Sequence, residues 1–200
     1  MEVIAEDGDV ILVIGADAKK LRVSTTFLSR FSKVFAVMFS GRYLEGKHLS
    51  SDDPEEIELP DDDYSTMLLL CRILHVEHEK LPESLTANQL LKLADAADKY
   101  DCTKTVRHTT LAWSNELTSH LHDAFTLHED ERFPSRNTMS TLDVFRATAA
   151  AYLLKDGRRF RFFTKRLALH EKRAYTLLPD PDVSRILPPA LFSMSMRRAE

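Results

Sequence analysis

The stretch that comes closest to a catalytic motif is residues 41–48, GRYLEGKH, which is within one residue of the phosphate-binding pattern GxxxxGK[ST]. Such a loop needs small residues whose backbone amides surround a phosphate, a hydroxyl after the lysine for magnesium, and a helix that starts at the loop. Here His48 replaces the hydroxyl, bulky side chains fill the loop, and residues 49–54 cannot form a core helix. We therefore keep a nucleoside triphosphatase only as a third option.

A second group, Cys71, His75 and His78, has a spacing that could bring three ligands to one metal ion along a helix. Cys71 also belongs to an apolar stripe with Met67 and Leu74, which favours a small buried hydrophobe. A structural zinc site needs four ligands, and no second Cys or His pair is spaced to complete one. No nucleophile–base order or paired-carboxylate motif is found elsewhere. We expect no catalytic, cofactor-binding or metal-binding residues, and so no enzyme.

Basic residues gather in one region, 155–173, where eight Lys and Arg face two acids. This region carries +6, which leaves −10 for the remainder because the whole chain carries −4. On a helix, Arg158, Arg161 and Lys165 share the face opposite an apolar stripe. We interpret this basic face first as a solvated surface that pairs with acids of the same molecule. The alternative is contact with nucleic acid or an acidic partner, although no base-reading element is found.

Length and composition describe a chain with enough apolar residues for one full core: 200 residues, of which 44% are hydrophobic. No run of about 18 apolar residues and no signal-peptide pattern is found. Two cysteines, Cys71 and Cys102, cannot build a disulfide framework and suit a reducing compartment. We expect an intracellular protein of the cytoplasm, the nucleus or both, without membrane contact.

Hydrophobic periodicity predicts a β-hairpin at residues 9–14 and 20–23, two short helices from residue 24 onward, and a strand at 56–59. Ser32 is expected to cap the second of these helices. One acid of residues 61–63 should cap the next helix, which has apolar positions at Met67, Leu70, Cys71 and Leu74.

Residues 86–89 spell a capping box, and the helix behind it aligns Leu90, Leu93, Ala94 and Ala97. A further helix is predicted at 103–117, and two more at 142–154 and 157–169. Prolines from residue 179 onward predict a tail without regular structure.

The order strand, strand, helix pair, strand and three helices resembles that of a BTB/POZ domain over roughly residues 8–117. Residues 9–14 are similar to the family's "DV" strand, and residues 90–102 to its "LLxLADKYxxxxL" helix and turn. The segments 149–156 and 160–170 resemble the trailing helices of BTB proteins of filamentous fungi. The resemblance implies an α+β fold in which a small sheet packs with a helical cluster, followed by a C-terminal helical extension.

The same resemblance implies a protein-interaction module, and its motifs narrow the choice of partner. Tyr43, Leu44 and Glu45 match the hydrophobic-x-Glu motif with which some members bind a cullin, so a substrate adaptor for a cullin-type ubiquitin ligase is expected. Ser24 and Thr25 stand where zinc-finger repressors carry His-Lys, which argues against that corepressor pocket. Only eight residues precede Asp9. We therefore expect the elements of the long-form dimer to be absent, and a homodimer stays an open alternative.

Four segments are expected in the chain. Residues 8–117 form the BTB-like domain, 118–140 a polar connector or insertion, 141–178 the helical extension and 179–200 a proline-containing tail.

Overall fold

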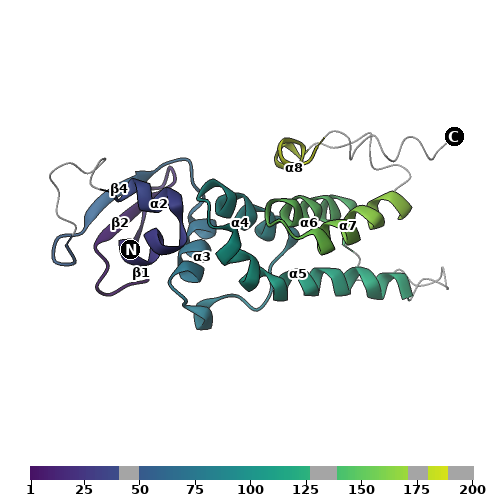
Figure 1. Cartoon of the computed structure of the whole chain (residues 1–200), viewed down its shortest axis with the longest axis horizontal. Helices are drawn as coiled ribbons and strands as arrows, with labels where there is room; N and C mark the ends of the chain where they lie inside the picture. Colours follow the sequence, from purple (N-terminus) through teal and green to yellow (C-terminus); the bar gives the residue numbers. More distant parts are fainter. Residues whose placement is uncertain (41–49, 127–138, 171–179, 189–200) are drawn as a thin grey trace. The chain divides into compact units, whose positions relative to one another are not determined.

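The computed structural model of the protein describes residues 1–40, 50–126, 139–170 and 180–188 (Figure 1). The chain divides into two compact units. Unit 1 comprises Met1–Pro82 and Asp95–Thr109, and unit 2 comprises Glu83–Ala94 and Thr110–Glu200. Two helices, α4 (Ala87–Lys99) and α5 (Thr103–Thr126), each contribute residues to both units.

Unit 1 is built on a four-stranded sheet with the order β1-β3-β2-β4. The predicted hairpin is confirmed as antiparallel β2 (Val10–Ile14) and β3 (Lys19–Val23), with Gly15 at φ +70° in the turn, a backbone conformation that favours glycine. β4 (Glu55–Leu59) pairs parallel to β2. Alternate residues of β2 are fully buried, so one face of the hairpin forms the core.

A fourth strand, β1 (Glu2–Val3), pairs parallel to β3 and was not predicted. A strand of two residues shows no alternation of apolar and polar side chains, so only its partner reveals it.

The helix pair after the hairpin begins at two different kinds of cap. α1 (Thr25–Phe31) follows Ser24, whose side chain makes no capping bond. Instead the Asp9 carboxylate accepts hydrogen bonds from the Thr25 backbone N–H at 2.8 Å and from the Thr25 hydroxyl at 2.5 Å. α2 (Lys33–Met38) has the predicted cap, because Ser32 Oγ accepts from the Phe35 N–H at 3.0 Å. Asp9 thus ties the first core strand to the start of α1.

The next helix, α3 (Tyr64–Leu74), is capped as the acidic run predicted. Asp63 Oδ1 accepts from the Thr66 N–H at 2.9 Å, and the predicted apolar stripe is fully buried. The helix ends before a single 3₁₀ turn, η1 (His78–Lys80). This helix therefore covers unit 1 with the residues that its periodicity assigned to the core.

Tyr100, just after α4, joins three parts of unit 1. Its ring is 1% exposed and stacks on Phe35 with centroids 4.4 Å apart. Its hydroxyl donates to Asp62 Oδ2 at 2.7 Å, and Lys99 Nζ lies 2.8 Å from the other carboxylate oxygen. Ser32 Oγ donates to the Tyr100 carbonyl at 2.5 Å. Burial, then the bond to Asp62, raises the pKa of Tyr100, so this hydroxyl remains a donor.

Unit 2 consists of helices. The capping box at the start of α4 is confirmed: Gln89 N–H donates to Thr86 Oγ1 at 3.2 Å, and Thr86 N–H donates to Gln89 Oε1 at 2.9 Å. α6 (Thr141–Leu153) packs against α7 (Gly157–His170) and against α8 (Pro181–Ile186). The α+β fold class is confirmed.

Two boundaries differ from the prediction. α5 continues past residue 117, where the predicted helix ended, so the helix includes residues 118–126, which we had assigned to a polar connector or insertion. The polar residues there suit a helix face, since the hydroxyls of Thr118 and Ser119 donate to carbonyls one turn back. The predicted irregular tail contains α8, in which Pro181 occupies the first turn, where a missing N–H costs nothing. Asp180 caps this helix by accepting from the N–H groups of Asp182 and Val183.

Candidate functional site

The predicted cullin-binding residues, Tyr43, Leu44 and Glu45, lie outside the described residues, as do residues 41–48 of the near phosphate-binding loop. The described chain reaches Ser40, just after α2, and resumes at Ser50, before β4. The motif therefore belongs to the connection between these two elements of unit 1, and its role stays a prediction.

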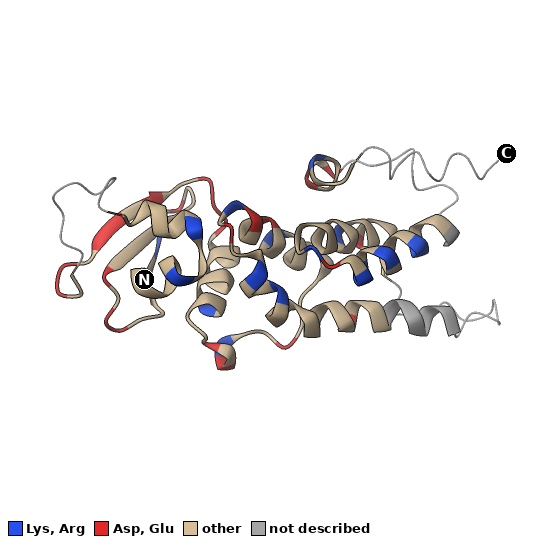
Figure 2. Cartoon of the chain, viewed as in Figure 1, with Lys and Arg blue, Asp and Glu red and all other residues tan. Residues whose placement is uncertain are grey.

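The predicted basic face lies on α7, where Figure 2 shows several Lys or Arg positions in blue. Arg158, Arg161 and Lys165 are all exposed. Phe163 and Leu167 are 1% and 5% exposed, so the apolar stripe faces the core. None of these three cations forms an ion pair with another described residue of unit 2. Their charges are therefore directed to solvent, and their function stays a prediction.

Arg159, next to Arg158 on α7, has a structural role instead. Its guanidinium forms an ion pair with Asp156, and one of its nitrogens donates to Asn115 Oδ1 at 2.6 Å and to the Leu111 carbonyl at 3.3 Å. These bonds hold the start of α7 against α5. The basic region thus contains a part-buried tether, Arg159, as well as exposed surface charge, a division that its sequence alone did not indicate.

Cys71, His75 and His78, whose spacing could suit a metal ion, do not come together in one site. His75 Nε2 accepts from the Ser24 N–H at 3.0 Å and His75 Nδ1 donates to the Cys71 carbonyl at 2.8 Å, so the backbone occupies both ring nitrogens. Cys71 is fully buried, whereas His78 is exposed in η1. No cluster of three His, Cys, Asp or Glu side chains suited to a metal ion occurs among the described residues.

Both cysteine thiols are held in their neutral form. Burial raises the pKa of Cys71, with a smaller effect of Cys102, and burial raises the pKa of Cys102 to about 12. A thiol with so high a pKa is a poor nucleophile at neutral pH. Both side chains are buried in unit 1, as the apolar stripe suggested for Cys71.

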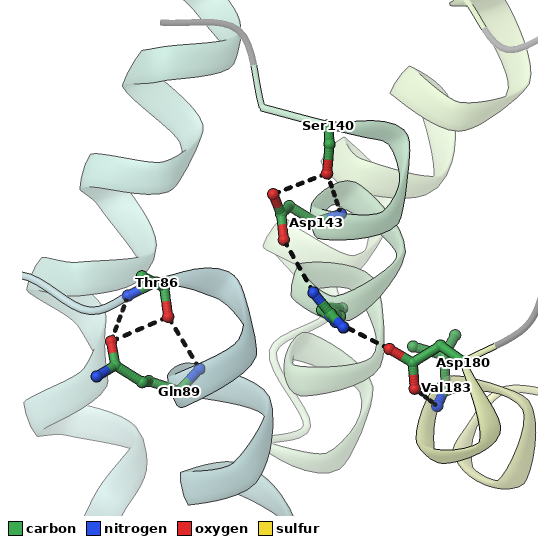
Figure 3. Close-up of polar contacts among 7 residues, drawn as sticks. Thr86, Gln89, Ser140, Asp143, Asp180 and Val183 are labelled. Carbon is green, nitrogen blue, oxygen red and sulfur yellow. Dashed lines mark hydrogen bonds and ion pairs between the residues drawn. The ribbon is translucent and has the colours of Figure 1, made fainter.

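A polar cluster in unit 2, centred on Arg146 of α6, was missed by the sequence reasoning. Arg146 Nε donates to Asp180 Oδ2 at 2.8 Å, and its NH1 lies 3.4 Å from Asp143 Oδ1 (Figure 3). Ser140 caps α6 by accepting from the Asp143 N–H at 3.1 Å. The sequence does contain a signal for the helix that carries Asp180: Asp180-Pro181-Asp182 is typical of a helix start. We missed it because the other prolines nearby favoured an irregular tail.

A cavity of about 560 Å³ adjoins this cluster. Its wall combines the residues before and at the start of α4 with Glu116 and Leu117 of α5 and with Asp143 and Arg146 of α6. The lining therefore mixes apolar side chains with both signs of charge.

A small mixed sheet packed with a helical cluster and extended by further helices defines an α+β class of protein, and the fold alone does not fix its function. A family model of the BTB/POZ domain matches residues 5–116, more than half of the chain, and the chain therefore belongs to the BTB/POZ family. BTB/POZ domains mediate protein–protein interactions and oligomerisation, and they are not typically catalytic. This confirms the resemblance of residues 8–117, and the chain carries a protein-interaction module.

A search of the curated proteins finds no match to this chain. Among the described helices, none has the length and apolar content that crossing a membrane requires.

Proposed function

We propose that this BTB/POZ protein is a substrate adaptor, which binds a cullin-type ubiquitin ligase through Tyr43, Leu44 and Glu45 and holds a client through its helical unit. The observation that carries the proposal is the presence of the hydrophobic-x-Glu motif between α2 and β4 of a BTB unit. A second compact unit in the same chain supports it, because an adaptor needs a surface for each of two partners.

The residue types of the motif suit an interface. Tyrosine buries a large ring at a low cost in side-chain entropy, and it is enriched among the residues that dominate binding energy. Truncating such an anchor costs about 2 kcal/mol, or about a thirtyfold loss of affinity. The carboxylate of Glu45 adds a charge that can pair with a basic partner and improve specificity.

The test measures binding of the full chain to purified N-terminal regions of cullins by calorimetry. Tyr43→Ala/Glu45→Ala should weaken binding about thirtyfold or more. The matched control is Val76→Ala/Glu79→Ala, an exposed apolar residue and an exposed acid elsewhere in unit 1, which should leave the affinity unchanged. Equal binding by wild type and the motif variant, or no binding by either, would remove the adaptor proposal.

A second candidate function is contact of the basic face with nucleic acid or an acidic partner. It is favoured by the exposure of Arg158, Arg161 and Lys165 along one side of α7. Phe162, on the same helix, is 37% exposed and could stack on a base.

Salt-dependent retention on DNA tests this candidate. If the face contacts phosphates, Arg158→Glu/Arg161→Glu should abolish retention, because it replaces two attractive charges with two repulsive ones. Each lost phosphate contact should also make the dependence of log K on log salt concentration less steep by about 0.9. Arg30→Glu/Lys104→Glu makes the same change in net charge at exposed positions of unit 1 and is the control. Retention that both variants reduce equally would show a nonspecific charge effect and count against the basic face.

A further inference from the structure

Residues 180–188, which contain α8, pack on α6 of unit 2 in the way that a short helical ligand would. Val183 is fully buried and Leu187 is 2% exposed, and the two stand three and seven positions after Asp180. α8 packs against α6, and both of these side chains are buried within unit 2. A helix of six residues is far shorter than the roughly 12 to 15 residues that an isolated helix needs in water. Its helical state therefore depends on the surface that receives it.

Arg146 provides the polar anchor of that surface. Its side chain is 24% exposed and that of Asp180 is 10% exposed, so the 2.8 Å pair between them is shielded from solvent. Figure 3 shows the guanidinium between Asp143 on its own helix and Asp180 on the docked segment. A planar guanidinium with several donors can hold both carboxylates in fixed directions. Asp180 also caps α8, so one carboxylate sets both the position and the start of the docked helix.

Small side chains are frequent on α6, which packs against both α7 and α8. Ala149 and Ala150, three and four positions after Arg146, share its helix face and are fully buried. Alanines on a helix face let a second backbone approach closely and leave room for its larger side chains. Recognition of a short helix by an apolar groove uses anchors at such i, i+3, i+4 and i+7 positions.

We propose that the α6 surface around Arg146 is a docking groove for a helical peptide segment of a client protein, and that residues 180–188 occupy this groove as an internal competitor. The client segment has an Asp or Glu that pairs with Arg146 and apolar residues three and seven positions later. The proposal deepens the proposed function and rests on its client-binding part, not on the cullin contact.

The cavity of about 560 Å³ beside the groove fits the same role, because Arg146 and Asp143 line both. A client segment longer than α8 reaches this cavity, where Leu117 and Met139 offer apolar contacts. Contacts in this cavity would add to those that a client segment makes in the place of α8, and they would favour its displacement of α8.

A labelled synthetic peptide of residues 178–190 is the probe for the groove, and fluorescence anisotropy measures its binding to the full chain. In the wild type, the internal segment competes at an effective concentration in the millimolar range. In the full-length variant Val183→Asp/Leu187→Asp this competitor is weakened while α6 is unchanged. If the peptide binds the open groove with a Kd of about a tenth of that effective concentration, the variant should bind it about tenfold more tightly than the wild type.

Charge reversal tests the anchor. Arg146→Glu in the opened variant should remove binding of the natural peptide, and a peptide carrying Asp180→Lys should recover it. If circular dichroism shows that Val183→Asp/Leu187→Asp loses helix content beyond α8, Asp180→Asn alone serves as the opened variant, because a neutral side chain forms no ion pair with either Arg146 or its Glu replacement. Equal peptide affinity for wild type and a folded opened variant would overturn the proposal. So would a wild-type dimer in light scattering that becomes monomeric in the opened variant, since the segment would then serve self-association.

The two proposals fail separately. Cullin binding should be the same in the opened variant as in the wild type, because its substitutions lie in α8. If the opened variant does not bind the peptide but the chain binds a cullin, only the groove is rejected. If the opened variant binds the peptide but the chain does not bind a cullin, only the cullin contact is rejected.

Discussion

His75 shows how one half-buried side chain can make unit 1 sensitive to pH. The Ser24 N–H donates to Nε2, so the proton of the neutral ring must be on Nδ1, where it is donated to the Cys71 carbonyl. The ring also stacks on Phe27 with centroids 5.2 Å apart. A proton added at Nε2 would face the Ser24 N–H and break this bond.

We predict that unit 1 loses stability as the pH falls below about 6.5, the ordinary pKa of histidine. Burial lowers the pKa of His75 despite the opposing effects of Glu77 and Asp7, so the unfolded chain binds the proton first. The full stability is present above about pH 6.5 and declines until the pH passes below the lowered folded pKa. Urea unfolding between pH 5 and 8 measures this dependence.

Two variants separate His75 from the other histidines. His75→Gln keeps an acceptor and a donor but does not titrate, so it should flatten the pH dependence. His108→Gln changes an exposed histidine of unit 1 and should leave the slope as in the wild type. An unchanged slope in His75→Gln would refute the assignment.

At the scale of elements, local capping and periodicity predicted most of the fold. The caps at Ser32, at Asp63 and at Thr86 were all found, because each joins a short polar side chain to an apolar run at helix spacing. The strands of the hairpin and the strand after residue 54 were found because β-branched runs and alternating apolar residues mark them. What the sequence could not predict depends on distant partners.

Three features illustrate this dependence. β1 is recognised only through its pairing with β3, and the cap of α1 comes from Asp9, which precedes it by a whole hairpin. The Arg146–Asp180 pair joins residues 34 positions apart, and no local pattern marks it. The basic face was anticipated as a surface, but the tether of Arg159 to α5 was not. Long-range polar contacts were therefore the part of the candidate sites that sequence reasoning missed.

Leu93 provides the element-scale prediction, because it is fully buried on the core face of α4. Leu93→Ala should lower the free energy of unfolding by about 2 to 5 kcal/mol, the cost of lost burial and a cavity. Lys92→Ala, at the exposed neighbouring position, should change it by less than about 0.5 kcal/mol. Denaturant titration followed by circular dichroism measures both. Similar values for the two variants would contradict the assigned core face of α4.

At the scale of the whole molecule, the two units share continuous helices. α4 begins in unit 2 and ends in unit 1, whereas α5 begins in unit 1 and continues into unit 2. Helix formation is cooperative along its length, because each residue added to an existing turn gains a hydrogen bond without a new nucleation cost. If one unit unfolds, α4 and α5 therefore lose their turns in that unit and fray into the other. We expect the two units to lose structure together.

This coupling predicts that a core substitution in unit 1 is detected by a probe in unit 2. Phe35→Ala removes a fully buried ring of unit 1 and should cost about 3 to 5 kcal/mol. Trp113, the single tryptophan of the chain, is 4% exposed in unit 2, so its fluorescence reports that unit. The denaturant concentration at the midpoint of the Trp113 fluorescence change should fall by as much as the midpoint at which the amides of β2 lose protection from hydrogen exchange. Coincident transitions mark one cooperative unit. A Trp113 midpoint that stays at the wild-type value while β2 loses protection would show that the units unfold independently.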